Sequence, residues 1–239
     1  MFYEHPAFQQ PKYENVSLWR YMDFTKFLLL LESSSLYFCR ADRLRKDDAF
    51  EGSFPKKEYE YLIKNIGEES THNIYNISSK STFVNCWHYS DKESIAMWKL
   101  YSEINKGVAI KTTVSNFTHS FHKIDTNVFA GIVQYIDFEK DSYYAKSDHK
   151  YRSGNLFTAY IHKRNIFEYE KEYRAIISDH TTTEENGFDI KVDLSMLVKE
   201  VVVAPNTPNW LFELIVVTTH RYVQDANISR SIFETKPYF

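Results

Sequence analysis

Glycine, proline and cysteine are scarce: the chain of 239 residues has six glycines, six prolines and two cysteines. The glycines form neither a Gly-x-Gly-x-x-Gly loop nor a P-loop, which excludes a glycine-rich phosphate cradle. The two cysteines, Cys39 and Cys86, provide no disulfide framework and are typical of a reducing compartment. The low content of glycine and proline also excludes a low-complexity chain.

Long apolar runs and a strong excess of one charge are absent as well. The longest apolar run, Phe27 to Leu31, is far shorter than the ~20 residues of a membrane-spanning helix. Residues 1–10 lack the charged-then-apolar pattern of a signal peptide. The formal net charge of -3 predicts no strong sequence-independent attraction to nucleic acid. We therefore expect a cytoplasmic protein that does not bind membranes.

Aromatic residues make up 17% of the chain, which is enough for a substantial core. Short β-prone runs alternate with segments whose apolar residues recur at helical spacing. We predict an N-terminal extension over residues 1–16 and one α+β domain over residues 17–239, with helices set between the strands of a mostly antiparallel, split sheet. The expected strands are 17–21, 35–39, 82–89, 108–112, 128–138, 169–177, 188–192, 197–204 and 228–233. The expected helices are 23–31, 92–102, 156–164 and 210–222, and residues 56–81 are expected to be mostly helical, with the clearest helical spacing at 57–65.

A charged motif opens the strand expected at residues 169–177. Glu170 and Glu172 are two residues apart, so on an extended backbone they share one face with Arg174. Burying two acids and an arginine is costly unless the groups are paired or used in chemistry. The motif alone indicates either an ion-pair network or a catalytic pocket, and Arg174 suits an ion pair with Glu51 or Glu172.

Metal and nucleophile signatures are weak. His119 and His122 are three residues apart, and His88 follows Cys86 by two. No other pair of Cys or His residues completes a tetrahedral zinc set of the usual spacing. There is no Gly-x-Ser-x-Gly elbow, and the aromatic setting of Cys86 in an expected strand is typical of a core thiol.

Seven short motifs follow one another along most of the chain. They are Leu18-Trp19-Arg20-Tyr21; Leu36-Tyr37-Phe38 with Asp48-Ala49-Phe50-Glu51-Gly52; Asn85-Cys86-Trp87; Met97-Trp98-x-x-Tyr101; Gly107-Val108-Ala109-Ile110; Tyr169-Glu170-x-Glu172-Tyr173-Arg174; and Ala204-Pro205. In this order they resemble the bacterial domain-of-unknown-function family 2971. The resemblance implies a family that is met near bacterial defence and mobile-element genes.

Three of these motifs carry a second resemblance. An Arg at the end of a first strand, an aromatic second strand and a Glu-x-Glu at a late strand are similar to the Arg/Ser-Thr-Ser/Glu-x-Glu plan of ADP-ribosyltransferases. The resemblance implies an ADP-ribosyltransferase-like fold, NAD as the substrate and no metal. It implies that Arg20, with Tyr21 beside it, binds the NAD pyrophosphate through its planar charged fork. Glu172 would bond the nicotinamide ribose 2′-hydroxyl and stabilise developing positive charge, and Glu170 would orient or deprotonate the acceptor.

The middle motif departs from that plan, because Asn85-Cys86-Trp87 stands where Ser-Thr-Ser is expected. On the same resemblance, Asn85 bonds ribose or nicotinamide and Trp87 stacks on the ring. A plain strand core explains Trp87 equally well. Arg20 has an alternative too, as a partly exposed strand arginine paired with an acidic neighbour.

Three functions follow as hypotheses. The first is an NAD-consuming enzyme of the ADP-ribosyltransferase type, a toxin or anti-phage defence effector that acts on protein, nucleic acid or NAD itself. The second is a metal-dependent nuclease with Asp48, Glu51, Glu170 and Glu172 as ligands, since Mg²⁺ prefers carboxylate oxygens. The third is a non-catalytic ligand-binding or sensor module. The acceptor and the oligomeric state do not follow from the sequence.

Overall fold

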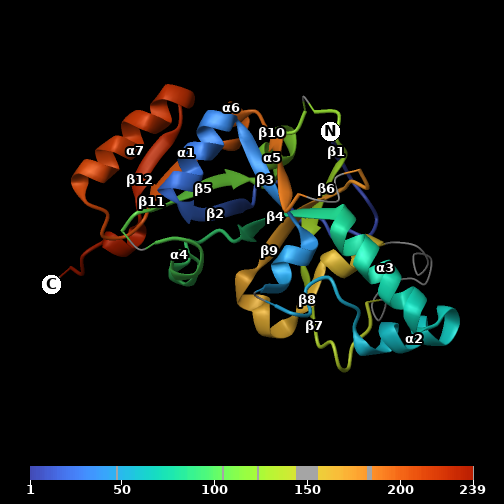
Figure 1. The fold of residues 1–239 in the computed structure, drawn as a ribbon. Helices are drawn as coiled ribbons and strands as arrows, with labels where there is room; N and C mark the ends of the chain where they lie inside the picture. The colour runs from blue at the N-terminus through green and yellow to red at the C-terminus, as the bar shows by residue number, and fades with distance from the viewer. Residues whose placement is uncertain (47, 104, 123, 144–155, 182–184, 239) are drawn as a thin grey trace.

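The computed structural model describes residues 1–46, 48–103, 105–122, 124–143, 156–181 and 185–238. Within these residues, ten strands form one mixed sheet and two more strands, β7 and β8, pair in parallel (Figure 1). This confirms the α+β class. Over the described residues the large sheet is mostly antiparallel, as predicted, and only its outer pairs β1–β6 and β11–β12 run parallel.

The sheet has the order β1-β6-β9-β4-β2-β5-β11-β12, and β3 joins β4 as a branch that continues to β10. Its strands and the small pair are β1 (Phe2–Tyr3), β2 (Ser17–Asp23), β3 (Ser35–Arg40), β4 (Thr82–Tyr89), β5 (Gly107–Thr113), β6 (Val128–Ile132), β7 (Gln134–Ile136), β8 (His162–Arg164), β9 (Glu172–Ser178), β10 (Gly187–Lys191), β11 (Glu200–Val203) and β12 (Asn227–Arg230).

Helices cover both faces of this sheet. The α-helices are α1 (Phe24–Ser33), α2 (Lys56–Ile66), α3 (Glu68–Ser81), α4 (Ile95–Tyr101), α5 (Val114–His119), α6 (Leu194–Leu197) and α7 (Asn209–Tyr222), and the short 3₁₀ segments are η1 (Ala41–Lys46), η3 (Leu156–Tyr160), η4 (Asn165–Glu170) and η5 (Ile232–Glu234). Figure 1 shows α1 and α7 side by side on one face. In the part of the chain that the structure describes, no helix has the length and apolar character needed to cross a membrane.

Alternation along the strands sends apolar side chains to both faces. On one face, Phe27 of α1, Phe117 of α5 and Ile215 of α7 belong to the largest core cluster, together with Trp87 of β4. The opposite face packs against Trp98 of α4 and, nearer β9, against η3. Because side chains alternate along β4, those with odd numbers face the largest core cluster and those with even numbers face the opposite side of the sheet.

Strand β4 is the point at which the sheet divides. One of its edges pairs with β9 along almost its whole length. The other edge pairs with β2 at residues 88–89 and with β3 at residues 83–84. Residues 85–87 lie between these two pairings, so β2 and β3 diverge there and leave a fork. This fork is the split that the sequence predicts.

Residues 1–16, predicted as an extension, pack onto the sheet. Phe2 and Tyr3 form β1 beside β6, and Phe8 is buried against Phe129 and Phe157. Other elements begin or end at different residues from those predicted. Ser94 caps α4 by accepting a bond from the N–H of Met97, so the helix begins three residues later than expected. The strand expected at 128–138 is split into β6 and β7, and the one expected from residue 197 begins at Glu200, because α6 occupies the preceding residues.

Candidate functional site

The three strands that carry the predicted motifs are direct neighbours in the order β9, β4, β2. In the register of β4 and β9, His88 faces Glu172 and Cys86 faces Arg174 across the pair. Cross-strand partners in an antiparallel pair project to the same face of the sheet. The face that holds Glu172 and Arg174 therefore holds Cys86 and His88, whereas Asn85 and Trp87 project to the opposite face.

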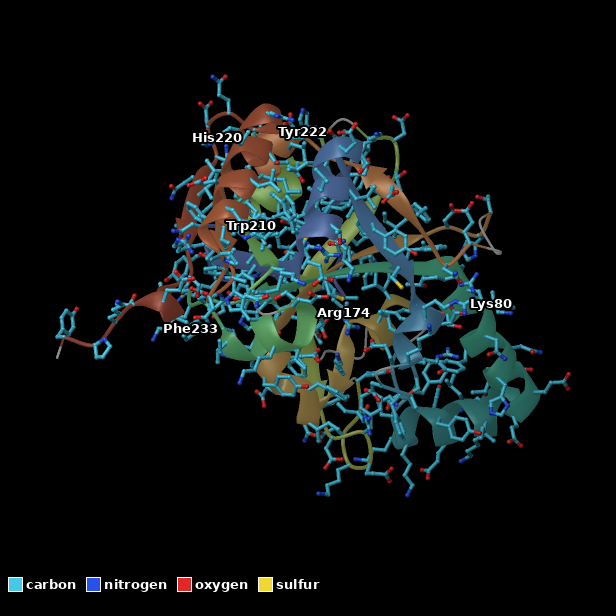
Figure 2. The ribbon with its side chains drawn as sticks, turned by 60° about the vertical axis from the view of Figure 1, so that its left-hand side comes forward. Lys80, Arg174, Trp210, His220, Tyr222 and Phe233 are labelled. Atoms are coloured by element: carbon cyan, nitrogen blue, oxygen red, sulfur yellow. The ribbon has the colours of Figure 1, made fainter. Side chains whose placement is uncertain are left out.

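Arg174 is the centre of a buried charge network and lies in the middle of the molecule (Figure 2). Its Nε donates to Glu172 Oε2 at 2.7 Å and its Nη2 donates to Glu172 Oε1 at 2.9 Å. Its Nη1 donates to Glu51 Oε1 at 2.5 Å and to the Tyr160 carbonyl at 2.8 Å. Both predicted partners of Arg174 are confirmed, since the guanidinium bonds Glu51 and Glu172 together.

Lys163 is the residue that joins Glu170 to this network. Its Nζ lies 2.5 Å from Glu170 Oε2, 2.9 Å from Glu172 Oε1 and 3.8 Å from Glu51 Oε2. Lys163 projects from the short strand β8, which the sequence analysis assigned to a helix. A lone lysine in a polar segment carries no signal for this role, so sequence reasoning missed it.

Glu170 reaches the cluster by a different route from the one predicted. It is the last residue of η4, and Lys171 adopts a left-handed conformation with φ of 43° before β9 begins. The extended backbone expected through residues 169–171 is therefore wrong. The turn nevertheless brings the carboxylate of Glu170 back beside Glu172, because both side chains converge on Lys163.

The surroundings shift the pKa values of the two carboxyl groups in opposite directions. Burial, followed by the hydrogen bond and the charge of Glu172, raises the pKa of Glu170 to about 7. Burial also acts to raise the pKa of Glu172, but the charges of Arg174 and Lys163 outweigh it and hold that pKa well below its usual range. Three carboxyl groups, including that of Glu51, share only two cations, which agrees with one proton held between Glu170 and Glu172.

Three more side chains surround this pair. Burial, followed by the charges of Glu170 and Glu172, raises the pKa of the Tyr101 hydroxyl, so this hydroxyl lies near the pair although 47% of the residue remains exposed. Burial and then the Glu172 charge raise the pKa of Cys86 well above its usual value. Such a thiol stays protonated, which fits a core residue better than a nucleophile. His88 Nδ1 lies 2.6 Å from the Glu170 carbonyl oxygen.

Arg20 lies in the fork. Tyr21 projects to the face of the sheet that holds Glu172 and Arg174. Arg20 Nη1 donates to the Cys86 carbonyl at 2.6 Å, in the gap where β4 has no strand partner on that edge, and its guanidinium lies 5.9 Å from the Trp87 ring. Tyr21 is buried, accepts a bond from the N–H of Ser94 at 2.9 Å and lies 6.2 Å from the ring of His88.

Asn85 and Trp87 bond each other inside the core. Trp87 Nε1 donates to Asn85 Oδ1 at 2.7 Å, and Asn85 Nδ2 donates to the Tyr37 carbonyl at 2.8 Å, which links β4 to β3 across the fork. Each of the two residues is only 1% exposed. The structure thus places them on the face opposite Glu172, and their role in cofactor binding stays a prediction.

The acids proposed as ligands for a nuclease metal are separated by cations. Lys163 and Arg174 stand between Glu51, Glu170 and Glu172. Asp48 is paired with Arg164 at 2.5 Å instead. Among the residues that the structure describes, no group of three His, Cys, Asp or Glu side chains is arranged to hold a metal ion.

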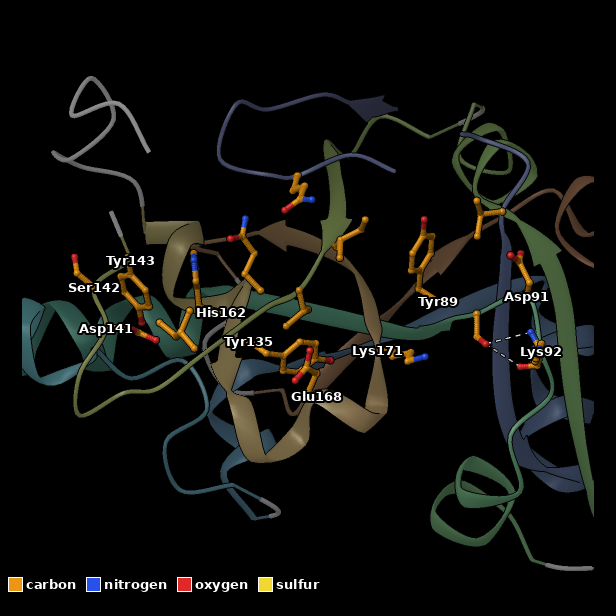
Figure 3. Close-up of a pocket in the computed structure, with 17 residues that line it drawn as sticks. Tyr89, Asp91, Lys92, Tyr135, Asp141, Ser142, Tyr143, His162, Glu168 and Lys171 are labelled. Carbon is orange, nitrogen blue, oxygen red and sulfur yellow. Dashed lines mark hydrogen bonds between the residues drawn. The ribbon is translucent and has the colours of Figure 1, made fainter. Parts of the chain in front are cut away.

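A cavity of about 890 Å³ is lined in part by Glu168 and Lys171, which are close to the two glutamates of the motif in the chain (Figure 3). Tyr143 and His162 line one end, and Tyr89 lines the other. Between them, the Tyr135 hydroxyl accepts a bond from the N–H of Glu172 at 2.8 Å. The wall of the cavity therefore touches the main chain of the motif, and its volume is within the range of small-molecule sites.

Gly52 supports the position of Glu51, and its replacement is a test of that support. Gly52 has φ of +68°, and a Cβ there would lie 2.5 Å from the Tyr160 ring. We expect Gly52→Ala to lower the free energy of unfolding by about 1–3 kcal/mol, measured by urea denaturation. Gly67→Ala is the matched control, because Gly67 has φ of +84° and no atom within 4 Å of its Cβ position. A smaller loss at Gly52 than at Gly67 would contradict the proposed contact.

Comparison with known proteins adds a family match. A model described as "Protein of unknown function (DUF2971)" matches residues 97–175, which run from α4 to the middle of β9 and cover about a third of the chain. The quoted motifs Met97–Tyr101, Gly107–Ile110 and Tyr169–Arg174 fall within this range. No curated protein matches the chain.

One solved structure is similar over most of the chain. It is DarT of Thermus sp. 2.9 in complex with NAD+, with 8% sequence identity, a TM-score of 0.40, 95% of this chain covered and 100% of that chain covered. At this TM-score the likeness supports no conclusion about activity. The resemblance to the DUF2971 family is confirmed for residues 97–175.

Proposed function

We propose that this protein is an NAD-consuming enzyme of the ADP-ribosyltransferase type. The observation that carries the proposal is the pair formed by Glu170 and Glu172, two buried carboxyl groups with opposite pKa shifts on one network. Titratable groups whose environments push their pKa values apart are a mark of acid and base roles in catalysis. Arg20 of β2, which donates to the Cys86 carbonyl in the fork, is proposed as the cation for an anionic substrate.

Glu172 is proposed to stabilise the positive charge that develops on the ribose as nicotinamide leaves. Its low pKa keeps it ionised, as electrostatic stabilisation requires. A carboxylate offers about four acceptor positions, and Arg174 and Lys163 use three of them. The remaining position lies near the side chains of Glu170 and Cys86, and we propose that it accepts the 2′-hydroxyl of a bound ribose.

Glu170 is proposed to take the proton of the acceptor. A base with a pKa near the working pH serves this purpose best. Arg20 and Tyr21 are proposed to bind the pyrophosphate end of NAD, with Asn85 and Trp87 supporting the β4 strand between them and the carboxylates. The acceptor class proposed is protein or nucleic acid, or water when NAD itself is hydrolysed, and the biological role is that of a toxin or anti-phage defence effector.

The first test is whether the purified protein acts on NAD. We expect nicotinamide release, measured by chromatography, and a rise in the melting temperature when NAD is added. A ligand at a hundredfold excess over its Kd stabilises the folded state by ~2.7 kcal/mol. If NAD is neither cleaved nor bound, while the same acids remain buried and paired, the network is structural and the proposal fails.

The pH dependence is a second test, because Glu170 must be ionised to act as a base. With a pKa of about 7, we expect the transfer rate to rise about tenfold per pH unit below that value and to level off above it. Glu172 has a pKa well below its usual range, so it stays ionised across this window.

The raised pKa of Glu170 also predicts how the free energy of unfolding changes with pH, which can be measured without any substrate. The folded state binds the Glu170 proton more tightly than the unfolded state, for which the ordinary pKa is 4.5. The contribution of Glu170 to the free energy of unfolding must therefore decrease as the pH rises from about 4.5 to about 7. In Glu170→Gln both this decrease and the rise in rate should disappear, and a variant with an unchanged rate profile would contradict the assignment.

A further inference from the structure

His88 is a buried histidine that the proposed function leaves without a role. It lies on β4, faces Glu172 across the strand pair and is 7% exposed. Its Nδ1 is 2.6 Å from the main-chain oxygen of Glu170. It is therefore within direct reach of the backbone of one acid and on the same face as the other.

This contact decides the tautomer of the ring. A carbonyl oxygen can only accept, so Nδ1 must carry the hydrogen. Burial lowers the pKa of His88, although the bond to Glu170 acts in the other direction, and the ring is neutral near pH 7. Nε2 is then an unprotonated acceptor, and within the described residues it has no hydrogen-bond partner.

The bond is one of several that hold the turn at Glu170. The others include the bond from the N–H of Lys171 to the Glu168 carbonyl and the contact of Lys163 with the Glu170 carboxyl group. Glu170 ends η4, and the next residue, Lys171, has φ of 43°. A left-handed conformation costs a residue other than glycine of the order of 1–2 kcal/mol, so neighbouring bonds must stabilise it. Two bonds from the end of β4 do so: His88 holds the carbonyl of Glu170, and the N–H of Tyr89 donates to the carbonyl of Lys171 at 2.7 Å.

We propose that His88 is a positioning residue of the candidate site: its Nδ1–H anchors the Glu170 carbonyl and so fixes the turn that brings the Glu170 carboxyl group beside Glu172. This proposal rests on the proposed function for its effect on rate, but its effect on geometry is independent of any activity. His88 lies just outside the predicted Asn85-Cys86-Trp87 motif, so the proposal gives strand β4 a functional residue that the motif does not contain.

A pair of amide substitutions separates the two nitrogens of the ring. In His88→Asn the side-chain amide takes the place of Nδ1 and can still donate to Glu170, whereas in His88→Gln it takes the place of Nε2. We expect kcat for nicotinamide release to stay within about threefold of wild type in His88→Asn and to fall about tenfold to a hundredfold in His88→Gln, with KM little changed in both. His119→Ala is the control, because it removes an exposed histidine that makes a similar bond, from Nδ1 to the Ser115 carbonyl at 2.7 Å. Equal kcat in the two amide variants would overturn the proposal.

The titration of Glu170, followed by carboxyl ¹³C NMR, tests the geometry without any turnover. We expect a pKa of about 7 in the wild type and a similar pKa in His88→Asn. In His88→Gln it should decrease, because the carboxyl group moves away from Glu172. If all three proteins titrate alike, His88 does not position Glu170. If the wild type releases no nicotinamide, the proposed function fails, and this titration alone decides the role of His88.

Discussion

Glu172→Gln is expected to lower nicotinamide release from NAD by about 100- to 1,000-fold, the range found when one preorganised electrostatic contact to a transition state is removed. In the proposed function, the carboxylate of Glu172 is the group whose negative charge stabilises the positive charge developing on the ribose. Glutamine keeps the size and can keep part of the hydrogen bonding, but it removes that charge. Turnover of NAD at saturating concentration is the direct measurement.

The matched control for this substitution is Glu51→Gln. Glu51 is as buried as Glu172 and bonds the same arginine, Arg174, at 2.5 Å. Glu51 lies farther from Lys163 than Glu170 and Glu172 do. Its Oε2 is 3.8 Å from the Lys163 Nζ, whereas Glu170 and Glu172 are 2.5 Å and 2.9 Å from the same atom. The two variants should lose similar stability, but Glu51→Gln should lose far less activity. Equal loss of activity in both would mean that the network acts only by maintaining the fold.

Arg174→Met is expected to have the largest effect on stability, a loss of about 3–5 kcal/mol in the free energy of unfolding. The side chain is 1% exposed and bonds Glu51, Glu172 and the Tyr160 carbonyl. Removing it leaves two buried carboxylates without their main cation, and uncompensated buried charge is what makes such losses large. Urea denaturation of the purified variant measures the effect.

Lys111→Met is the control for a similar ion pair near the surface. Lys111 lies 2.8 Å from Glu200, with side chains that are 31% and 27% exposed. Solvent screens such a pair, so the expected loss is about 0–1 kcal/mol. If Arg174→Met loses no more stability than Lys111→Met, the buried network contributes little to folding. In that case the carboxyl groups of Glu51 and Glu172 are protonated in the variant. The loss in the free energy of unfolding would then appear only at higher pH.

Some features of this protein follow from local sequence alone. Strand β4, strand β9 and helix α7 are recognisable because alternation and helical spacing of apolar residues are local patterns. The prediction that Glu172 and Arg174 share a face also needs only the alternation along one strand, and their contact at 2.7 Å confirms it. The face to which Asn85 and Trp87 project, by contrast, follows from their odd numbers only when the register of β4 with β9 is known.

The composition of the site was decided by tertiary structure. Glu51 meets Arg174 across 123 residues of sequence, and no local pattern encodes such a contact. Lys163 is found only when β8 lies beside η4 and β9, and it is the cation that draws Glu170 and Glu172 together. Glu170 itself was expected on the strand face, but it arrives through a left-handed turn that His88 and Tyr89 hold from β4.

The sequence by itself thus determined which residues are acids and bases, and it placed Glu172 and Arg174 on one face of one strand. The pKa values that would make Glu170 and Glu172 useful depend on burial and on the distance to Lys163 and Arg174. Coulombic and desolvation energies vary steeply with distance and depth, whereas a sequence records only separation along the chain. For that reason the motif contains two similar glutamates in the sequence, and only the folded protein lowers the pKa of Glu172 and raises that of Glu170 to about 7.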